Sequence, residues 1–93
     1  IAKAEREVIR LEQDCRWYKT DLQAKEDEIL NSGVIDGKNE ALRNAQLRQF
    51  TAQYRQEVTG AENSLLRAQS ELRLLQTELR ALQSVADLLK GAA

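Results

Sequence analysis

The chain has 93 residues, the size of one small domain, with 42% hydrophobic, 31% charged and only 4% aromatic residues. It has no His and a single Cys, which excludes an intrachain disulfide, a Cys-cluster metal site and the commonest general base. Its 14 basic residues balance 15 acidic ones, and its apolar runs are too short to span a membrane. We therefore expect a non-enzymatic helical protein, with no catalytic residue, cofactor or metal and no membrane partner.

Residues 1–30 carry an apolar repeat of seven. The first set of positions (a) and the set three residues later (d) are filled by Ile1, Val8, Cys15, Leu22 and Ile29, and by Ala4, Leu11 and Tyr18. Such a repeat predicts a coiled-coil helix over about residues 1–30. Because the chain begins at Ile1 within the pattern and without Met, we also expect the natural protein to have residues before Ile1.

Residues 31–38 read as a loop, because Gly, Asn, Ser and Asp are concentrated there. Either Asn31 or Gly33 is expected to end the first helix in a left-handed conformation. Asp36 or Asn39 is expected to cap the next one. Val34 and Ile35 are expected to fold back over the helix ends.

The apolar pattern of residues 39–90 predicts one long helix, because the a and d positions follow the seven-residue repeat from Thr51 to Leu89 without a shift. Gly60 lies inside it and could bend it. The alternative is a break at Gly60, which would give a three-helix bundle. If the two long helices form an antiparallel coiled-coil hairpin, the pairing places Ile1 near Ala68 and Glu12 near Arg55.

This hairpin leaves residues 69–90 without an intrachain partner, although they are rich in leucine. An apolar stripe this wide is typical of a helix with neighbours in a bundle. Three partners are possible: residues before Ile1 that extend the first helix, a second copy of the chain, or a different protein. We favour self-association and expect a homo-oligomer, a dimer or higher, or a bound partner protein. The predicted interface comprises Leu65, Leu72, Leu74, Leu75, Leu79, Leu82, Val85, Leu88 and Leu89.

Two side chains in the first helix have alternative interpretations. Cys15 fills an a position and is expected to be a small buried hydrophobe, because no His is present to activate its thiol. Trp17 lies on the outer edge of the helix. It could pack against a second chain or the loop, or it could anchor a partner protein, since Trp is enriched among interface hot spots.

The stretch 38–55 supports a different class of function. Lys38, Arg43, Arg48 and Arg55 could contact phosphates, and nearby aromatic residues could stack on bases. The alternative to a protein-binding module is therefore a nucleic-acid-associated accessory protein.

The segment from Gly37 to Leu47 carries a Gly-Lys-Asn turn with Arg43 four residues after Asn39. It resembles a segment of small helical coiled-coil proteins from bacteriophage and prophage genomes, in which an acidic helix, this turn and a longer charged helix follow one another. The resemblance implies a viral setting and the cytoplasm of a bacterial host. It implies no activity. The predicted function is protein–protein interaction, as an assembly factor, adaptor or small inhibitor.

Overall fold

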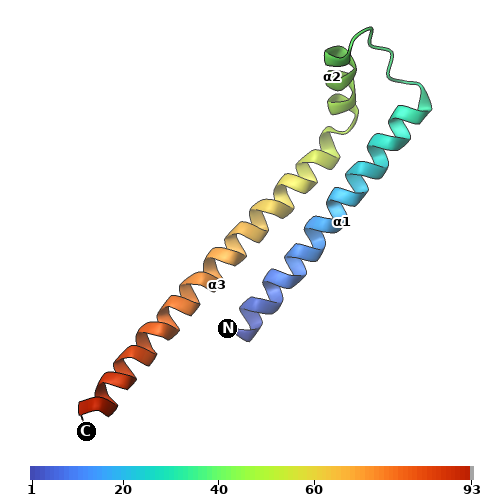
Figure 1. The fold of residues 1–93 in the computed structure, drawn as a ribbon. Coiled ribbons are helices and arrows are strands. Elements are labelled where there is room, and N and C mark those ends of the chain that lie inside the picture. Colours follow the sequence, from blue (N-terminus) through green and yellow to red (C-terminus); the bar gives the residue numbers. More distant parts are fainter. Residues whose placement is uncertain (93) are drawn as a thin grey trace.

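The computed structural model describes residues 1–92 of the protein, and all regular structure in that range is helical, which confirms the predicted all-α class. Helix α1 spans Ala2–Ser32, α2 spans Glu40–Phe50 and α3 spans Ala52–Ala92 (Figure 1). The molecule is a rod with extents of 78 × 22 × 14 Å. Its shape is set by α1 lying beside the first part of α3, with the two helices running in opposite directions (Figure 1).

The contact between α1 and α3 follows the apolar repeat. Val8, Cys15 and Ile29 of α1 are buried, and so are Val58 and Ala68 of α3. All five occupy predicted a or d positions, one set facing the other along the two helices. Removing a Val or Ile side chain from water contributes about 1.5–3 kcal/mol, so burial along this narrow seam stabilises the contact between α1 and α3.

The turn after α1 resolves the two alternatives for each helix end. Gly33 ends α1 with φ 78° and ψ 8°, a left-handed conformation that glycine adopts without steric cost. Asn39 caps α2, because its Oδ1 accepts a hydrogen bond from the Leu42 N–H at 2.8 Å. Val34 is half exposed, so the expected hydrophobic cover is limited to the partly buried Ile35.

Gln46 of α2 fastens this loop to the helix. Its Oε1 accepts from the backbone N–H groups of Asp36 at 3.1 Å and Gly37 at 3.0 Å. Its Nε2 donates to the Asp36 carboxylate at 2.7 Å. At Gly37 the loop approaches α2 so closely that a Cβ would lie 2.8 Å from the Arg43 nitrogen, so only glycine fits there.

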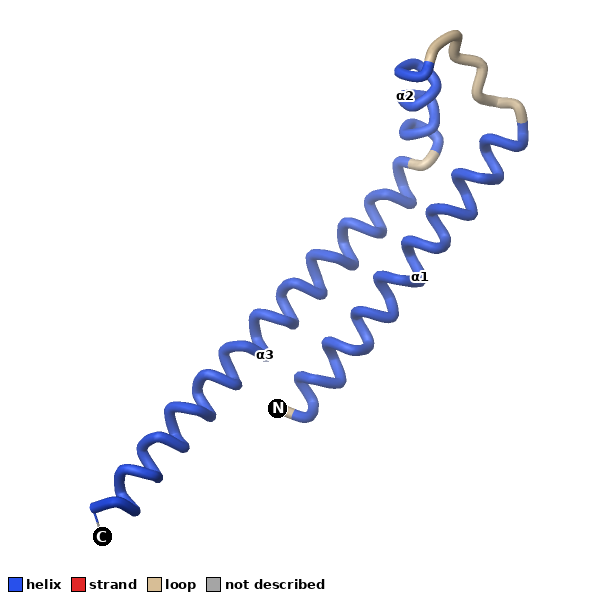
Figure 2. Tube along the Cα trace, viewed as in Figure 1, coloured by secondary structure: helices blue, strands red, loops and turns tan. Residues whose placement is uncertain are grey.

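The predicted helix over 39–90 is divided at Thr51, not bent or broken at Gly60. Thr51 has φ −108° and ψ 12°, and α2 and α3 point in different directions on its two sides (Figure 2). Its Oγ1 donates to the Leu47 carbonyl at 2.8 Å, a bond to the preceding turn that bends helices. Helix α3 continues through Gly60 without interruption, which excludes a three-helix bundle with its break at Gly60.

Candidate interaction surface

The division at Thr51 also changes which residues meet across the two long helices. Arg55 meets Glu26, with Nη2 and Oε1 3.0 Å apart, so the predicted pairing with Glu12 is wrong. Ile1 shares a surface hollow with Leu75, not with Ala68. The 11 residues of α2 do not continue the axis of α3. The start of α1 therefore lies beside a later part of α3 than it would in a hairpin whose second helix ran straight from residue 39.

Beyond Leu75, α3 extends alone past the start of α1 (Figure 1). We call residues 76–92 the C-terminal segment. Its apolar residues are open to solvent: Leu82 is 68% exposed, Leu88 74% and Leu89 68%. Leu79 and Val85 are about half exposed. By contrast, Val58 and Ala68, at equivalent positions beside α1, are 9% and 8% exposed.

The predicted interface residues therefore fall into two groups. Leu65 and Leu72 are half buried and lie in the part of α3 that α1 accompanies. Leu74 lies on the outer side of the same part and is 63% exposed, while Leu75 borders the hollow beside Ile1. The remaining five, which are Leu79, Leu82, Val85, Leu88 and Leu89, belong to the C-terminal segment. The uncovered seam is thus shorter than predicted and begins later in the chain.

The hollow at the start of α1 marks the boundary between covered and uncovered α3. It is lined by Ile1, Lys3, Ala4, Glu7, Glu71 and Leu75. Its carboxylates include Glu7, which accepts two hydrogen bonds from the Arg10 guanidinium, at 2.6 and 3.1 Å. This contact lowers the pKa of Glu7.

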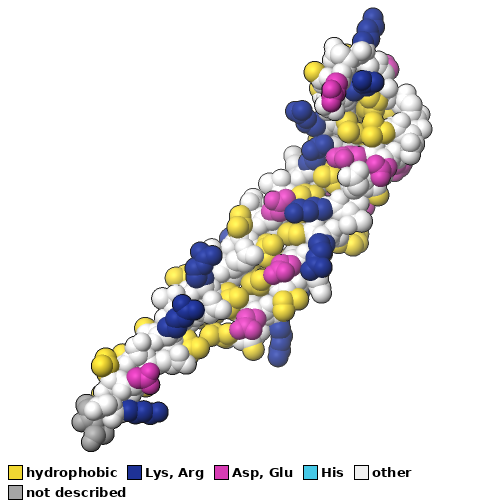
Figure 3. All heavy atoms as spheres, viewed as in Figure 1, with side chains coloured by type: hydrophobic (Ala, Val, Ile, Leu, Met, Phe, Trp, Pro, Cys, Tyr) yellow, Lys and Arg dark blue, Asp and Glu magenta, His cyan; other side chains and the backbone are white. Residues whose placement is uncertain are grey.

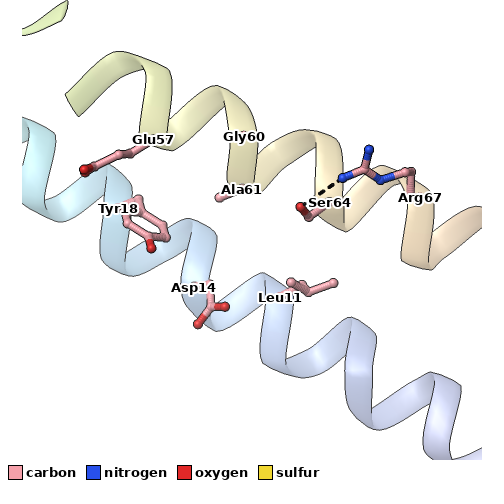
Figure 4. Close-up of a pocket in the computed structure, with 8 residues that line it drawn as sticks. All are labelled: Leu11, Asp14, Tyr18, Glu57, Gly60, Ala61, Ser64 and Arg67. Carbon is pink, nitrogen blue, oxygen red and sulfur yellow. Dashed lines mark hydrogen bonds between the residues drawn. The ribbon is translucent and has the colours of Figure 1, made fainter. Parts of the chain in front are cut away.

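A second hollow lies between α1 and α3 around Gly60 and Ala61 (Figure 4). It exists because these two small residues face Tyr18 and Leu11 across the seam and leave space between the helices. Arg67 donates to the Ser64 hydroxyl at 3.4 Å at one end. The hollow is a gap in helix packing, with a mixed lining and no convergent set of reactive groups.

Trp17 is 62% exposed on α1, and its ring stands edge-on to Tyr18 with 5.1 Å between ring centroids. Its exposure leaves most of the indole available to a partner, so the anchor interpretation stays a prediction. Cys15 is 5% exposed, as expected of a buried thiol. Within residues 1–92 there is no group of three or more His, Cys, Asp or Glu side chains that could hold a metal ion.

The four basic candidates do not form one surface. Lys38, Arg43 and Arg48 are exposed on the loop and α2. Arg55 is separate, because it is bound to Glu26 and its Nε donates to the buried Thr51 hydroxyl at 3.1 Å. The space-filling view shows basic, acidic and apolar side chains interspersed along the rod (Figure 3). The stretch 38–55 therefore offers at most three free cations.

None of the helices in residues 1–92 is apolar over a length that would cross a membrane. Comparison with protein-family models, with curated proteins and with solved structures finds no match to this chain.

Proposed function

We propose that this chain is a non-enzymatic coiled-coil interaction module that self-associates through the C-terminal segment of α3. In this proposal α1 and α3 form an antiparallel coiled-coil hairpin, and the uncovered part of α3 supplies the interface. The exposure of Leu82 and Leu89 carries the proposal, because Ala68, at the equivalent d position beside α1, is buried. A row of exposed leucines on a helix is typical of a protein–protein contact.

Burial of the exposed leucines offsets a substantial part of the cost of association. Burying an exposed leucine contributes about 1.5–3 kcal/mol. Two copies would together bury six seam leucines, Leu79, Leu82 and Leu89 from each. Because these leucines are already partly buried, the free energy gained by burying them is reduced. The reduced gain approaches or exceeds the lower part of the roughly 4–15 kcal/mol lost in translational and rotational freedom on association. A dimer would bury the seam leucines, and a larger bundle would also cover Leu74 and Leu88.

Such a module fits an assembly factor, an adaptor or a small inhibitor, in which the helical rod presents Trp17 or the α2 end to another protein. The resemblance of the turn after α1 to bacteriophage proteins adds a viral setting and a cytoplasmic location in a bacterial host to the proposal.

The test is the solution mass of the chain and of a charged variant. Leu82→Asp with Leu89→Asp should convert the assembly to a monomer, because each change places a charge in the apolar seam. The matched control is Thr77→Asp with Ser84→Asp, which adds the same charge on the opposite side of the same helix and should leave the mass unchanged. Light scattering coupled to size exclusion measures the mass, and circular dichroism verifies helicity. A monomeric unmodified chain at micromolar concentration would overturn the proposal.

A further inference from the structure

The junction between α2 and α3 has the properties of a hinge (Figure 2). We propose that α2 and the loop residues 36–39 form a rigid arm that pivots at Thr51. In this proposal the chain alternates between the bent structure and a straight form in which residues 40–92 make one helix. The inference concerns a different part of the chain from the proposed self-association and does not depend on it.

The apolar repeat is compatible with both forms. Leu47, Thr51 and Tyr54 are spaced by four and then three residues, so the a and d series crosses the junction in phase. Thr51 is the single residue between the two helices. Neither Gly nor Pro occurs from Leu47 to Tyr54, so no helix-breaking residue specifies the bend.

The backbone change that separates the two forms is small. Thr51 has φ −108° and ψ 12°, which differ from the helical values of about −63° and −42° by about 45° and 54°. Both conformations have negative φ and lie in neighbouring allowed regions, so no forbidden region separates them. Hinges commonly absorb a movement in this way, at a few residues where an element ends.

Straightening completes the hydrogen bonds of the helix. The main-chain bonds at the junction run from the Thr51 N–H to the Leu47 carbonyl at 3.1 Å, and from the Arg55 N–H to the Thr51 carbonyl at 3.0 Å. Within residues 1–92, the bent form lacks the bonds that a continuous helix places from residues 52, 53 and 54 to residues 48, 49 and 50. The straight form recovers these bonds, and this gain opposes the loss of the contacts that α2 makes in the bent form.

Few contacts hold α2 in the bent position. None of its residues is buried. The side-chain hydrogen bonds of α2 run from Gln46 to Asp36 and Gly37, in the loop segment that leads directly into this helix. Gly37 also packs closely against the backbone of Arg43. The loop segment and α2 therefore move as one unit.

The other side of the junction is fixed to α1. Thr51 is fully buried, and Arg55 links it to α1, because Nε donates to the Thr51 hydroxyl at 3.1 Å and Nη2 donates to Glu26 at 3.0 Å. The bond from the Thr51 hydroxyl to the preceding turn is not sufficient for a bend. Thr20 and Thr77 make the same bond at 2.9 Å inside uninterrupted helices. Thr51 is therefore an anchored pivot at which the helix direction changes.

Distances between two spin labels on one chain distinguish one form from two. Ala45 on α2 and Ser70 on α3 are both exposed. Each is changed to Cys in the 93-residue chain carrying Cys15→Ala, and the labelled chain is diluted with unlabelled chain so that pulsed electron resonance measures separations within one molecule. In the straight form their spacing of 25 residues corresponds to about 38 Å at 1.5 Å per residue, and the bend shortens it.

We expect two populations of distances, one near 38 Å and one shorter. A single narrow distance, short or long, in the chain that keeps Thr51 would overturn the hinge. Thr59→Cys with Ser84→Cys is the matched label pair, because it has the same spacing wholly within α3 and should give a single distance near 38 Å.

The role of Thr51 is tested by Thr51→Ala in the chain labelled at Ala45 and Ser70. This change removes the hydroxyl bonds to the Leu47 carbonyl and Arg55, so the share of the long distance should increase. An unchanged share would overturn the assignment of Thr51 as the pivot. Thr77→Ala removes the same kind of bond from the middle of α3 and should leave the distribution as it is. Circular dichroism of each variant verifies that the helices remain.

Discussion

Replacing Gly60 by Ala should stabilise the protein, whereas a glycine-to-alanine change at Gly33 or Gly37 should destabilise it. Gly60 lies inside α3, and an added Cβ would have no other atom within 4 Å beyond its own helical surroundings. Glycine in a helix interior costs about 0.8–1.0 kcal/mol relative to alanine, because the unfolded glycine loses more backbone freedom. With no steric cost to offset it, nearly the whole amount should appear as added stability.

The structure supplies a matched control in Gly33. Its φ of 78° is in the left-handed region, where a Cβ is strained by about 1–2 kcal/mol. Gly33→Ala should therefore destabilise the chain, while the identical change at Gly60 stabilises it. At Gly37 a Cβ would press within 2.8 Å of the Arg43 backbone nitrogen, so Gly37→Ala should also destabilise.

Thermal unfolding followed by far-UV circular dichroism measures these effects. One protein concentration must be used throughout, because the proposed self-association would make Tm depend on concentration. A change of 1 kcal/mol shifts Tm by about 4–8 °C in a domain of this size, so Gly60→Ala should raise Tm and Gly33→Ala should lower it by amounts of that order or somewhat larger. A fall in Tm for Gly60→Ala would refute the continuity of α3 and restore a turn at Gly60.

Three further outcomes are expected. Gln46→Ala should remove the hydrogen bonds that hold the loop and speed amide exchange at Gly37, measured by NMR, while unchanged exchange there would refute the fastening role. A double-mutant cycle on Arg55 and Glu26, using Met and Gln replacements, should give a coupling of about 0.5–1 kcal/mol in urea unfolding, since Arg55 is 41% exposed and water screens the pair; zero coupling would argue against the contact. A labelled DNA or RNA oligonucleotide should show no binding by fluorescence anisotropy at low salt, and salt-dependent binding that is lost when Arg43 and Lys38 become Gln would favour the nucleic-acid interpretation instead.

The ends of the predicted helices followed from local chemistry and were accessible to sequence reasoning. Gly33 and Asn39 were each one of two candidates for their positions, and the structure selects them. The kink at Thr51 was not accessible in this way. Thr51 keeps the heptad phase, and the bond from its hydroxyl to the Leu47 carbonyl changes the helix direction without disturbing the apolar periodicity.

The hairpin register shows the same limit for the candidate surface. Pairing inferred from a single turn put Arg55 beside Glu12, because both lie at flank positions of matching heptads. In the structure Arg55 reaches Glu26, since α2 and its loop set where α3 begins relative to α1. The pattern identified a leucine-rich face, but it could not say that Leu72 already lies alongside α1.

The sequence by itself determined that this protein is helical and which face of each helix is apolar, including the leucine-rich face of residues 69–90. These properties depend on residue type and spacing, which act locally along the chain. Only the tertiary structure decided how far α1 extends along α3, and hence that the uncovered surface begins after Leu75. That boundary depends on the path of the chain through the loop, α2 and the kink at Thr51, where a few hydrogen bonds set the direction of everything that follows.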